Sequence, residues 1–218
     1  EGEPLAKINP KDGVIFFNFR PDRARELTKA FVLPSFPKFE REYIKDLFFV
    51  TMTQYEKSLP VVVVYQPVIV HNCLSEVLSK NNLKQFHIAE TEKYAHITFF
   101  LNGTIEEPFP GEERKIIPSP KVPSYDKAPE MSAAEIAKEV VKVVDEEVYD
   151  VILLNFANAD MVGHTGDMPA TIKGCEAIDL AFGSIVEHAL AKDGIVLMTA
   201  DHGNGEEVTN IRTGERDK

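Results

Sequence analysis

The sequence predicts an α/β protein built on largely parallel sheets. Short runs rich in Val, Ile and Phe recur along the chain, and several are apolar throughout, which is typical of buried parallel strands. Residues at helical spacing lie between the later runs, and strands that alternate with helices form parallel sheets. Hydrophobic residues make up 44% of the 218 residues, so the chain can bury a substantial core.

The apolar runs and the helical segments give an order of elements. A capping box at Ser132 and Glu135 predicts the start of a helix whose apolar face holds Ile136 and Val140. A second helix is predicted over residues 168–190, between the last two strands. Six strands are expected, over residues 13–19, 47–51, 61–65, 96–101, 151–156 and 195–200.

Two segments are interpreted as connections. Residues 66–70, with Pro67 after a strand, indicate a crossover between two bodies, so the predicted domains are 1–67 and 68–218. Residues 108–125 carry five prolines and are expected to form a long ordered surface loop. A buried type of strand near the first residue, and a polar loop at the last, indicate a protein truncated at both ends.

Composition excludes several classes of partner. A net charge of −11 and a pI near 5.1 argue against nucleic acid or an anionic membrane surface, since both need a basic face. The apolar runs are too short to span a bilayer, and the first residues do not resemble a signal peptide. Cys73 and Cys175 lie far apart, so neither a disulfide framework nor a thiolate zinc site is indicated. A reducing, cytoplasmic setting fits these features.

Two Asp-His pairs follow predicted strands and are candidates for binding metal. Asp160 and His164 are four residues apart, a spacing that places both on one side of a helical turn. Asp201 and His202 are adjacent at the end of the last apolar run. Ligands in open α/β sheets collect at the carboxyl ends of strands, so the two pairs should converge. Oxygen and nitrogen ligands without thiolate point to Mn²⁺, Zn²⁺ or Mg²⁺ in hydrolysis or phosphoryl transfer. Taken singly, each pair is more often a cap or a turn hydrogen bond.

Basic residues near two strands could bind phosphate. Arg20 and Arg23 form an Arg-x-x-Arg pattern at a predicted helix start, where their guanidinium groups can face the same way. Pairing with surface acids is an equal alternative. Lys93 could place its charge on a phosphate, although a lysine between acids is usually solvated. The other histidines are interpreted as surface or core residues: His71, His87, His96 and His188.

Six ordered motifs give the chain a recognisable pattern. They are Phe-Phe-Asn-Phe-Arg-Pro-Asp-Arg-Ala-Arg, Ala-Glu-Thr-Glu-Lys-Tyr-Ala-His, Pro-Phe-Pro-Gly-Glu-Glu-Arg, Pro-Ser-Pro-Lys-Val, Asn-Phe-Ala-Asn-x-Asp-Met-Val-Gly-His-Thr-Gly and Ala-Asp-His-Gly-Asn. In this order they resemble the 2,3-bisphosphoglycerate-independent phosphoglycerate mutases over almost the entire chain. Six motifs in order are far more specific than any one of them.

The resemblance implies an alkaline-phosphatase-like fold, in which a metal-binding phosphatase domain carries an inserted substrate-binding (transferase) domain. Residues 1–67 would be the end of the inserted α/β domain, and 68–218 an incomplete part of the parallel-sheet phosphatase domain. The family interconverts 3-phosphoglycerate and 2-phosphoglycerate in glycolysis and gluconeogenesis, through a phosphoserine intermediate. It is a metal-dependent isomerase, usually monomeric, so a complete protein of this kind is expected to be a monomer that binds phosphoglycerate.

The resemblance also implies roles for residues of this chain. Asp160 and His164 are similar to the ligands of one Mn²⁺, and Asp201 and His202 to those of another; Mg²⁺, Zn²⁺ or Co²⁺ could replace Mn²⁺. Lys93 is similar to the lysine beside the nucleophile and the phosphate. The equivalents of the substrate-holding arginines are Arg20 and Arg23.

The sequence departs from the family at its ends. The family's nucleophilic serine and an early aspartate ligand are expected before Glu1, and a further histidine ligand beyond Lys218, so no serine of this chain is named. We expect the isolated chain to lack turnover, to bind metal weakly and to be unstable. The alternatives are another metal-dependent phosphohydrolase or phosphopentomutase of the same superfamily, and a catalytically inactive fragment that serves as an interaction module.

Overall fold

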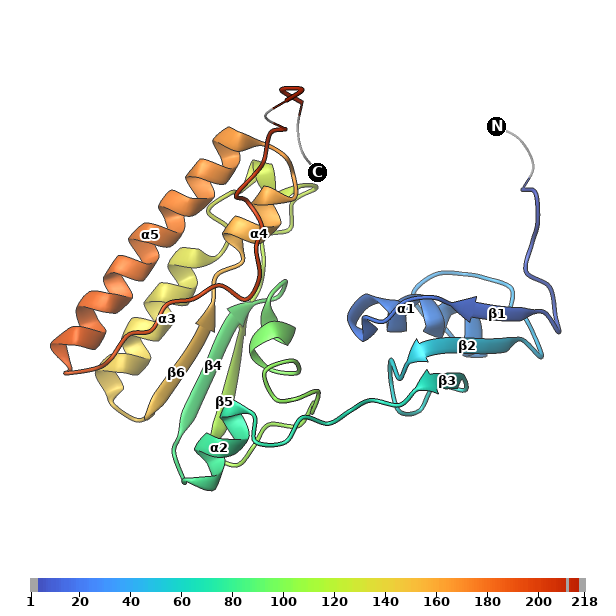
Figure 1. The fold of residues 1–218 in the computed structure, drawn as a ribbon, viewed down its shortest axis with the longest axis horizontal. Helices are drawn as coiled ribbons and strands as arrows, with labels where there is room; N and C mark the ends of the chain where they lie inside the picture. Colours follow the sequence, from blue (N-terminus) through green and yellow to red (C-terminus); the bar gives the residue numbers. More distant parts are fainter. Residues whose placement is uncertain (1–3, 211, 216–218) are drawn as a thin grey trace. The chain divides into compact units, whose positions relative to one another are not determined.

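The computed structural model describes residues 4–210 and 212–215, and the chain divides into two compact units, Glu1–Val68 and Ile69–Lys218. Each unit contains its own three-stranded parallel sheet (Figure 1). Among the described residues, no helix combines the length and the apolar composition that crossing a membrane requires. The α/β class with parallel sheets that the sequence predicts is therefore confirmed.

The first unit is a sheet of order β1-β2-β3 with one helix. Its strands are β1 (Gly13–Phe16), β2 (Phe48–Thr53) and β3 (Val62–Tyr65), and α1 (Pro21–Val32) follows β1. Proline at the first helical position fixes a helical φ where the missing N–H costs no hydrogen bond. The core holds Ala24, Val32, Phe49, Tyr55 and Leu59.

β1 ends three residues earlier than the sequence predicts. The backbone turns after Phe16, where Asn18 donates its N–H to the Phe16 carbonyl oxygen over 2.9 Å. The side chain of Asn18 then accepts a hydrogen bond from the backbone N–H of Arg20, also over 2.9 Å. The hydroxyl of Tyr55 donates to backbone oxygens of this turn, so the chain leaves the sheet before α1 begins.

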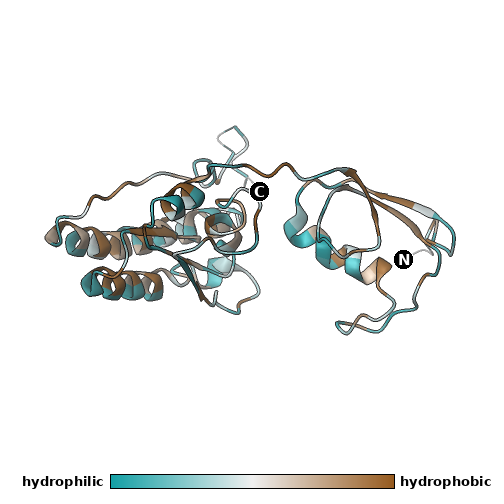
Figure 2. Ribbon diagram, turned by 90° about the horizontal axis from the view of Figure 1, so that it is seen from below, coloured by the Kyte–Doolittle hydropathy of each residue, from teal (hydrophilic) through white to brown (hydrophobic). Residues whose placement is uncertain are grey.

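The second unit is a sheet of order β5-β4-β6 covered by two long helices. The strands are β4 (Gln85–Glu90), β5 (Glu112–Ile117) and β6 (Val151–Asn155). The helices α3 (Ala133–Glu146) and α5 (Met168–Ala191) run side by side (Figure 1), and Figure 2 shows hydrophobic colour along both. They bury a core against β4 that contains Phe86, Ile88, Ala133, Ile136, Ala137, Val140, Val143, Ala181 and Ile185. The shorter elements are α2 (Leu74–Lys80), α4 (Asn158–Gly163) and the 3₁₀ turns η1 (Tyr94–Ile97) and η2 (Tyr125–Lys127).

Two predicted strands are wrong. Residues 96–101 form the end of η1 and the turns after it, because their amides bond locally: Phe100 N–H donates to Ala95 O, and Asn102 N–H to Thr98 O. Residues 195–200 are extended but belong to no strand of the described chain, so Ile195 and Leu197 are 89% and 91% exposed. Apolar composition predicts burial, but a strand also needs a partner edge.

Two further predictions need correction. The expected loop over 108–125 contains β5, whose charged residues are accommodated because Glu112 accepts hydrogen bonds from Asn102 and Arg114. The capping box does not form, although α3 begins where predicted: the Ser132 hydroxyl donates to Pro118 O over 2.8 Å. Ser132 therefore links α3 to the segment after β5.

Candidate functional site

The polar residues of the second unit collect at one end of its parallel sheet. Lys93 follows β4, and Asp160 lies in α4, directly after β6, so both come from the carboxyl ends of neighbouring strands. Asp201 and His202 follow the extended segment 194–200, which brings them to the same place. This is the position at which open α/β sheets bind ligands.

Lys93 lies at the centre of the cluster and is only 1% exposed. Its Nζ is 2.9 Å from Asp160 Oδ2, 3.1 Å from Asp201 Oδ2 and 2.8 Å from His202 Nε2. A lysine between acidic residues in a sequence is usually solvated, but the structure buries Lys93. An ammonium group can only donate, so His202 Nε2 accepts, while His202 Nδ1 is 3.1 Å from the Gly203 carbonyl oxygen and can donate to it. In this tautomer the lone pair of Nε2 points into the cluster.

His164 and Asn204 contact the Asp160 carboxylate in addition to Lys93. His164 Nε2 is 3.1 Å from Asp160 Oδ1, as expected for residues four apart in a helical turn. The side-chain amide of Asn204 donates to the same carboxylate oxygen over 2.7 Å and to the Asp160 backbone oxygen over 3.1 Å. Asn204 thus fixes the segment after Asp201 against α4. His164 itself remains largely exposed, at 64% of its side chain.

Both carboxyl groups are held in the ionised form. Burial alone would raise the pKa of Asp160, but the hydrogen bonds from Asn204 and Lys93 and the charge of Lys93 outweigh it and lower that pKa. Burial would likewise raise the pKa of Asp201, and the hydrogen bond and charge of Lys93 lower it instead. The cluster is therefore two carboxylates gathered around one cation.

Such a donor set fits a divalent ion. Donor atoms that share one ion through bonds of roughly 2.0–2.2 Å lie about 3–4.4 Å apart. His202 Nε2 is 3.7 Å from Asp160 Oδ2 and 3.8 Å from Asp201 Oδ1, and the Asp160–His164 pair is 3.1 Å apart. The four residues predicted from the two Asp-His pairs are thus brought together by the structure.

His96 is a member of this site that sequence reasoning missed. Ligand atoms of His96, Asp201 and His202 all lie within 4.8 Å of one another. The sequence alone led us to interpret His96 as an ordinary surface or core residue, and the structure places it beside Asp201 and His202. A signal was available, because His96 comes three residues after Lys93 and therefore one turn away. His87, in contrast, is a fully buried core residue beside the Ile97 oxygen and Gln85, and burial lowers its pKa.

Glycines allow the two loops of the site to touch. A Cβ at Gly163 would lie 3.3 Å from the backbone of Gly205, which is closer than most side chains tolerate. Gly205 has a φ of +88°, a left-handed conformation that favours glycine. The segment that carries Asp201 can therefore approach the end of α4.

Arg20 and Arg23 belong to the first unit, at the start of α1. Arg20 precedes the helix, and its side chain is 67% exposed and 3.3 Å from Asp22. Pairing with a surface acid was the alternative to phosphate binding that we gave for Arg20 from the sequence, and the structure shows such a pair. Because the pair is exposed, it contributes little to stability and can be exchanged for another anion.

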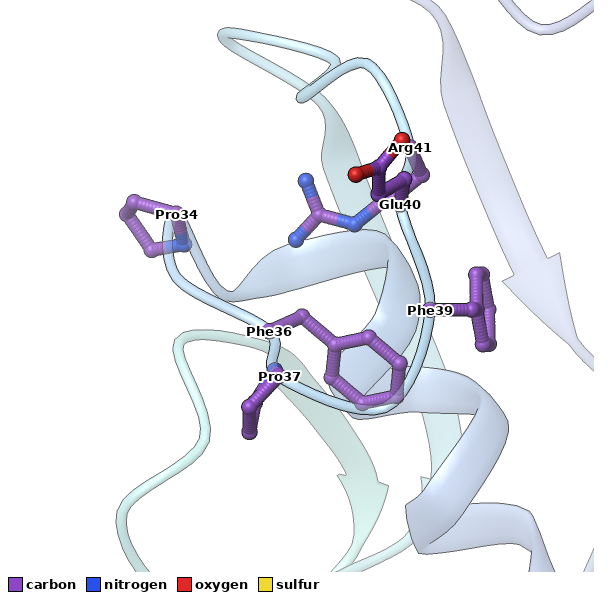
Figure 3. Close-up of a pocket in the computed structure, with 6 residues that line it drawn as sticks. All are labelled: Pro34, Phe36, Pro37, Phe39, Glu40 and Arg41. Carbon is purple, nitrogen blue, oxygen red and sulfur yellow. The ribbon is translucent and has the colours of Figure 1, made fainter.

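A hollow of ≈ 560 Å³ lies in the first unit, away from these residues (Figure 3). Its only charged lining residues are Glu40 and Arg41. The Arg41 guanidinium lies 5.4 Å from the ring centre of Tyr43 and donates to the Leu33 carbonyl oxygen, so its contacts fix the loop after α1. The hollow therefore offers no cluster of reactive groups.

Comparisons with known proteins agree on one kind of relative. The model of the Metalloenzyme superfamily matches residues 52–215, and the model of the BPG-independent PGAM N-terminus matches residues 1–57. Proteins named 2,3-bisphosphoglycerate-independent phosphoglycerate mutase are 50% identical in Chloroflexus aurantiacus and 54% identical in Clostridium botulinum. The alignments cover 98% and 99% of this chain, but 43% and 42% of those proteins.

A solved structure gives the same result. The structure described as Leishmania mexicana phosphoglycerate mutase at low cobalt concentration has a TM-score of 0.88 and 33% sequence identity, over 99% of this chain and 40% of its own. The likeness agrees with the alkaline-phosphatase-like fold that the motifs imply. The chain spans about two fifths of the length of the relatives it matches. It belongs to the metalloenzyme superfamily, and the relatives it resembles at about half identity are 2,3-bisphosphoglycerate-independent phosphoglycerate mutases.

Proposed function

We propose that this chain carries part of the active site of a 2,3-bisphosphoglycerate-independent phosphoglycerate mutase, which interconverts 3-phosphoglycerate and 2-phosphoglycerate through a phosphoserine intermediate. The observation that supports this most is the gathering of Lys93, Asp160, Asp201 and His202 at one end of the sheet. The similarity to named mutases adds the substrate. The reaction belongs to glycolysis and gluconeogenesis, and a monomer in the cytoplasm is the expected setting.

The site residues divide into two metal-binding pairs and one phosphate-binding group. Asp160 and His164 would hold one divalent ion, and Asp201 and His202 a second, both proposed to be Mn²⁺, with Mg²⁺, Zn²⁺ or Co²⁺ as substitutes. Bound ions would lower the pKa of an attacking hydroxyl and neutralise phosphoryl oxygens. Lys93 would donate to the transferring phosphoryl group, because its ammonium already lies between the two carboxylates.

The first unit would hold the substrate. We assign residues 1–67 to the end of a substrate-binding domain and 68–218 to the metal-binding phosphatase domain. Arg20 and Arg23 would bind the phosphate or carboxylate of phosphoglycerate and keep glycerate from leaving between the two half-reactions. No serine of this chain is assigned as the nucleophile.

Phosphorus NMR of the intact gene product tests this function. 3-Phosphoglycerate should convert to 2-phosphoglycerate with Mn²⁺ and without bisphosphoglycerate, and EDTA should stop the conversion. The Asp201→Asn variant should lose the activity by several orders of magnitude, whereas Asp179→Asn, an exposed change on α5, should not. Release of inorganic phosphate alone would replace the mutase with a phosphohydrolase, and absence of any turnover would favour a non-catalytic protein.

A further inference from the structure

We infer that Asn204 and Gly205 form a site of spontaneous deamidation, where the fold brings the reacting atoms together and the product carboxylate faces Asp160. Asparagine is one of the chemically labile residues of proteins. An Asn-Gly pair leaves the attacking backbone nitrogen uncrowded, because glycine has no Cβ. The reaction needs only water, so the inference does not depend on the proposed function.

The positions of the reacting atoms carry the argument. The backbone nitrogen of Gly205 is 2.8 Å from Asn204 Oδ1. Because a carbonyl bond is about 1.23 Å long, this nitrogen lies no more than about 4 Å from Asn204 Cγ, near the roughly 3–3.5 Å of atoms poised to react. Asn204 Nδ2 donates to Asp160 Oδ1 over 2.7 Å and to the Asp160 backbone oxygen over 3.1 Å. These contacts fix the side chain with its carbonyl group beside the nitrogen that attacks it.

The covalent steps need no cofactor. The Gly205 amide loses its proton to solvent hydroxide, and its nitrogen forms a bond to Asn204 Cγ. The bond from Cγ to Nδ2 breaks, and the nitrogen leaves as ammonia with a proton taken from water. Water then opens the resulting cyclic imide at either of its carbonyl carbons, so that residue 204 becomes aspartate or isoaspartate. Nothing is oxidised or reduced: the net reaction consumes water and releases ammonia.

A second Asn-Gly pair, Asn102 and Gly103, supplies an internal comparison. Asn102 is fully buried, and its side-chain amide donates to Glu112 over 2.7 Å. The N–H of Gly103 donates to the Phe100 carbonyl oxygen over 3.2 Å, so this hydrogen points to another residue and not to the Asn102 side chain. Asn204, in contrast, is only half-buried. The fold therefore protects the first pair and leaves the second poised to react.

The product would break the contact that holds this loop to α4. A carboxylate at position 204 has no N–H to donate, and its oxygens would face the Asp160 carboxylate across the 2.7 Å that the amide spans. Two carboxylates this close repel each other strongly. Isoaspartate would also lengthen the backbone beside Gly205, where a Cβ on Gly163 would already lie only 3.3 Å away. Deamidation should therefore release the segment after Asp201 from α4.

Peptide mapping by mass spectrometry tests the inference on the intact gene product, incubated in EDTA in H₂¹⁸O. Hydrolysis of the imide takes up ¹⁸O, which separates sites that react during the incubation from sites altered before it. In the folded protein Asn204 should deamidate at least about 10-fold faster than Asn102, which must first break its buried hydrogen bond to Glu112. In urea the two pairs should react at similar rates. Part of the Asn204 product should be isoaspartate, the mark of the imide route.

The Asn204→Asp variant tests the consequence for the fold. In EDTA it should melt about 4 °C or more below the wild type, because its carboxylate opposes that of Asp160. The matched control is Asn82→Asp, which makes the same change of charge at an exposed asparagine of the same unit. This control should melt within about 2 °C of the wild type.

Three results would overturn the inference. Equal rates at Asn204 and Asn102 in the folded protein, or a rate ratio in urea as large as the folded one, would show that the fold does not select the site. A product without isoaspartate would rule out attack by the Gly205 nitrogen. Equal melting of Asn204→Asp and Asn82→Asp would rule out the clash with Asp160.

Discussion

The Lys93→Met variant should destabilise the metal-free protein, because it removes the cation that two carboxylates share. Methionine keeps most of the apolar stem, so the packing changes little. Removing one partner of a fully buried ion pair costs about 3–5 kcal/mol, and an exposed pair is worth about 0–1 kcal/mol. The side chains of Asp160 and Asp201 are 16% and 32% exposed, so the cost should lie between these limits, at about 2–3 kcal/mol.

The assay is thermal unfolding of the intact gene product in EDTA and again with excess Mn²⁺. In EDTA the variant should melt several degrees below the wild type, because 1 kcal/mol shifts the melting temperature of a domain of 150–250 residues by roughly 2–4 °C. With Mn²⁺ the difference should shrink, because bound ions take over the neutralisation of the carboxylates. Lys192→Met is the matched control: its ion pair with Glu147 is exposed, so the variant should melt within about 2 °C of the wild type. Equal melting of Lys93→Met and wild type in EDTA would refute the reasoning.

Three further perturbations test the fold and the buried charges. Ile136 is a fully buried core residue, so Ile136→Ala should lower the free energy of unfolding by about 2–5 kcal/mol in urea titrations. The control is Leu180→Ala at a side chain that is 77% exposed, which should lower it by less than about 0.5 kcal/mol. Similar losses in the two variants would place Ile136 outside the core. Burial raises the pKa of Glu90, so the folded protein holds the proton of this carboxyl more tightly than the unfolded chain does. The stability gained from this proton is complete below the unfolded pKa of about 4.3 and is lost as the pH rises through the folded pKa. Glu90→Gln should flatten that decline in melting scans across pH, and an unchanged slope would contradict a buried acid. Gly103→Ala should lower the free energy of unfolding by more than about 1 kcal/mol, since φ is +66° and the new Cβ would lie 2.3 Å from a carbonyl oxygen. Gly183 faces open space on α5, so Gly183→Ala should stabilise the protein slightly. Urea titrations that rank the two variants the other way would be incompatible with this backbone.

Sequence reasoning placed an apolar strand or helix closely where the run pairs in a sheet or packs as a helix, and it missed strands that carry polar residues. β2, β3 and β6 and the long helix α5 are rich in apolar residues, and each lies within two residues of its predicted bounds. β4 was missed although it is buried at every position, because its sequence contains Gln85, His87 and Glu90. The tertiary structure makes this possible: the Gln85 amide donates to the Ser75 carbonyl oxygen, and His87 contacts the Ile97 oxygen. These partners lie ten residues away in the neighbouring segments, and the periodicity of a strand carries no trace of them.

The site shows the same limit. The spacing of the two Asp-His pairs in the sequence, four residues in one and one in the other, was enough to predict that each pair lies together. The approach of His96 to Asp201 joins residues about a hundred positions apart, and it depends on η1, which the sequence reasoning interpreted as a strand. An alternating side-chain pattern would have pointed His96 and Thr98 to the same face of a sheet. The 3₁₀ turn directs His96 to the cluster instead.

The extended segment 194–200 bears on how the 218-residue chain behaves at high concentration. Residues 195–200 contain no charge and no proline and favour β structure, which is the composition of segments that stack into fibrils. Their apolar side chains are exposed, and their backbone is open to a second molecule. Charged residues flank the segment, namely Lys192, Asp193 and Asp201, and the net charge of −11 makes copies of the chain repel one another. High salt screens that repulsion, so preparations of this chain should precipitate more readily as ionic strength rises.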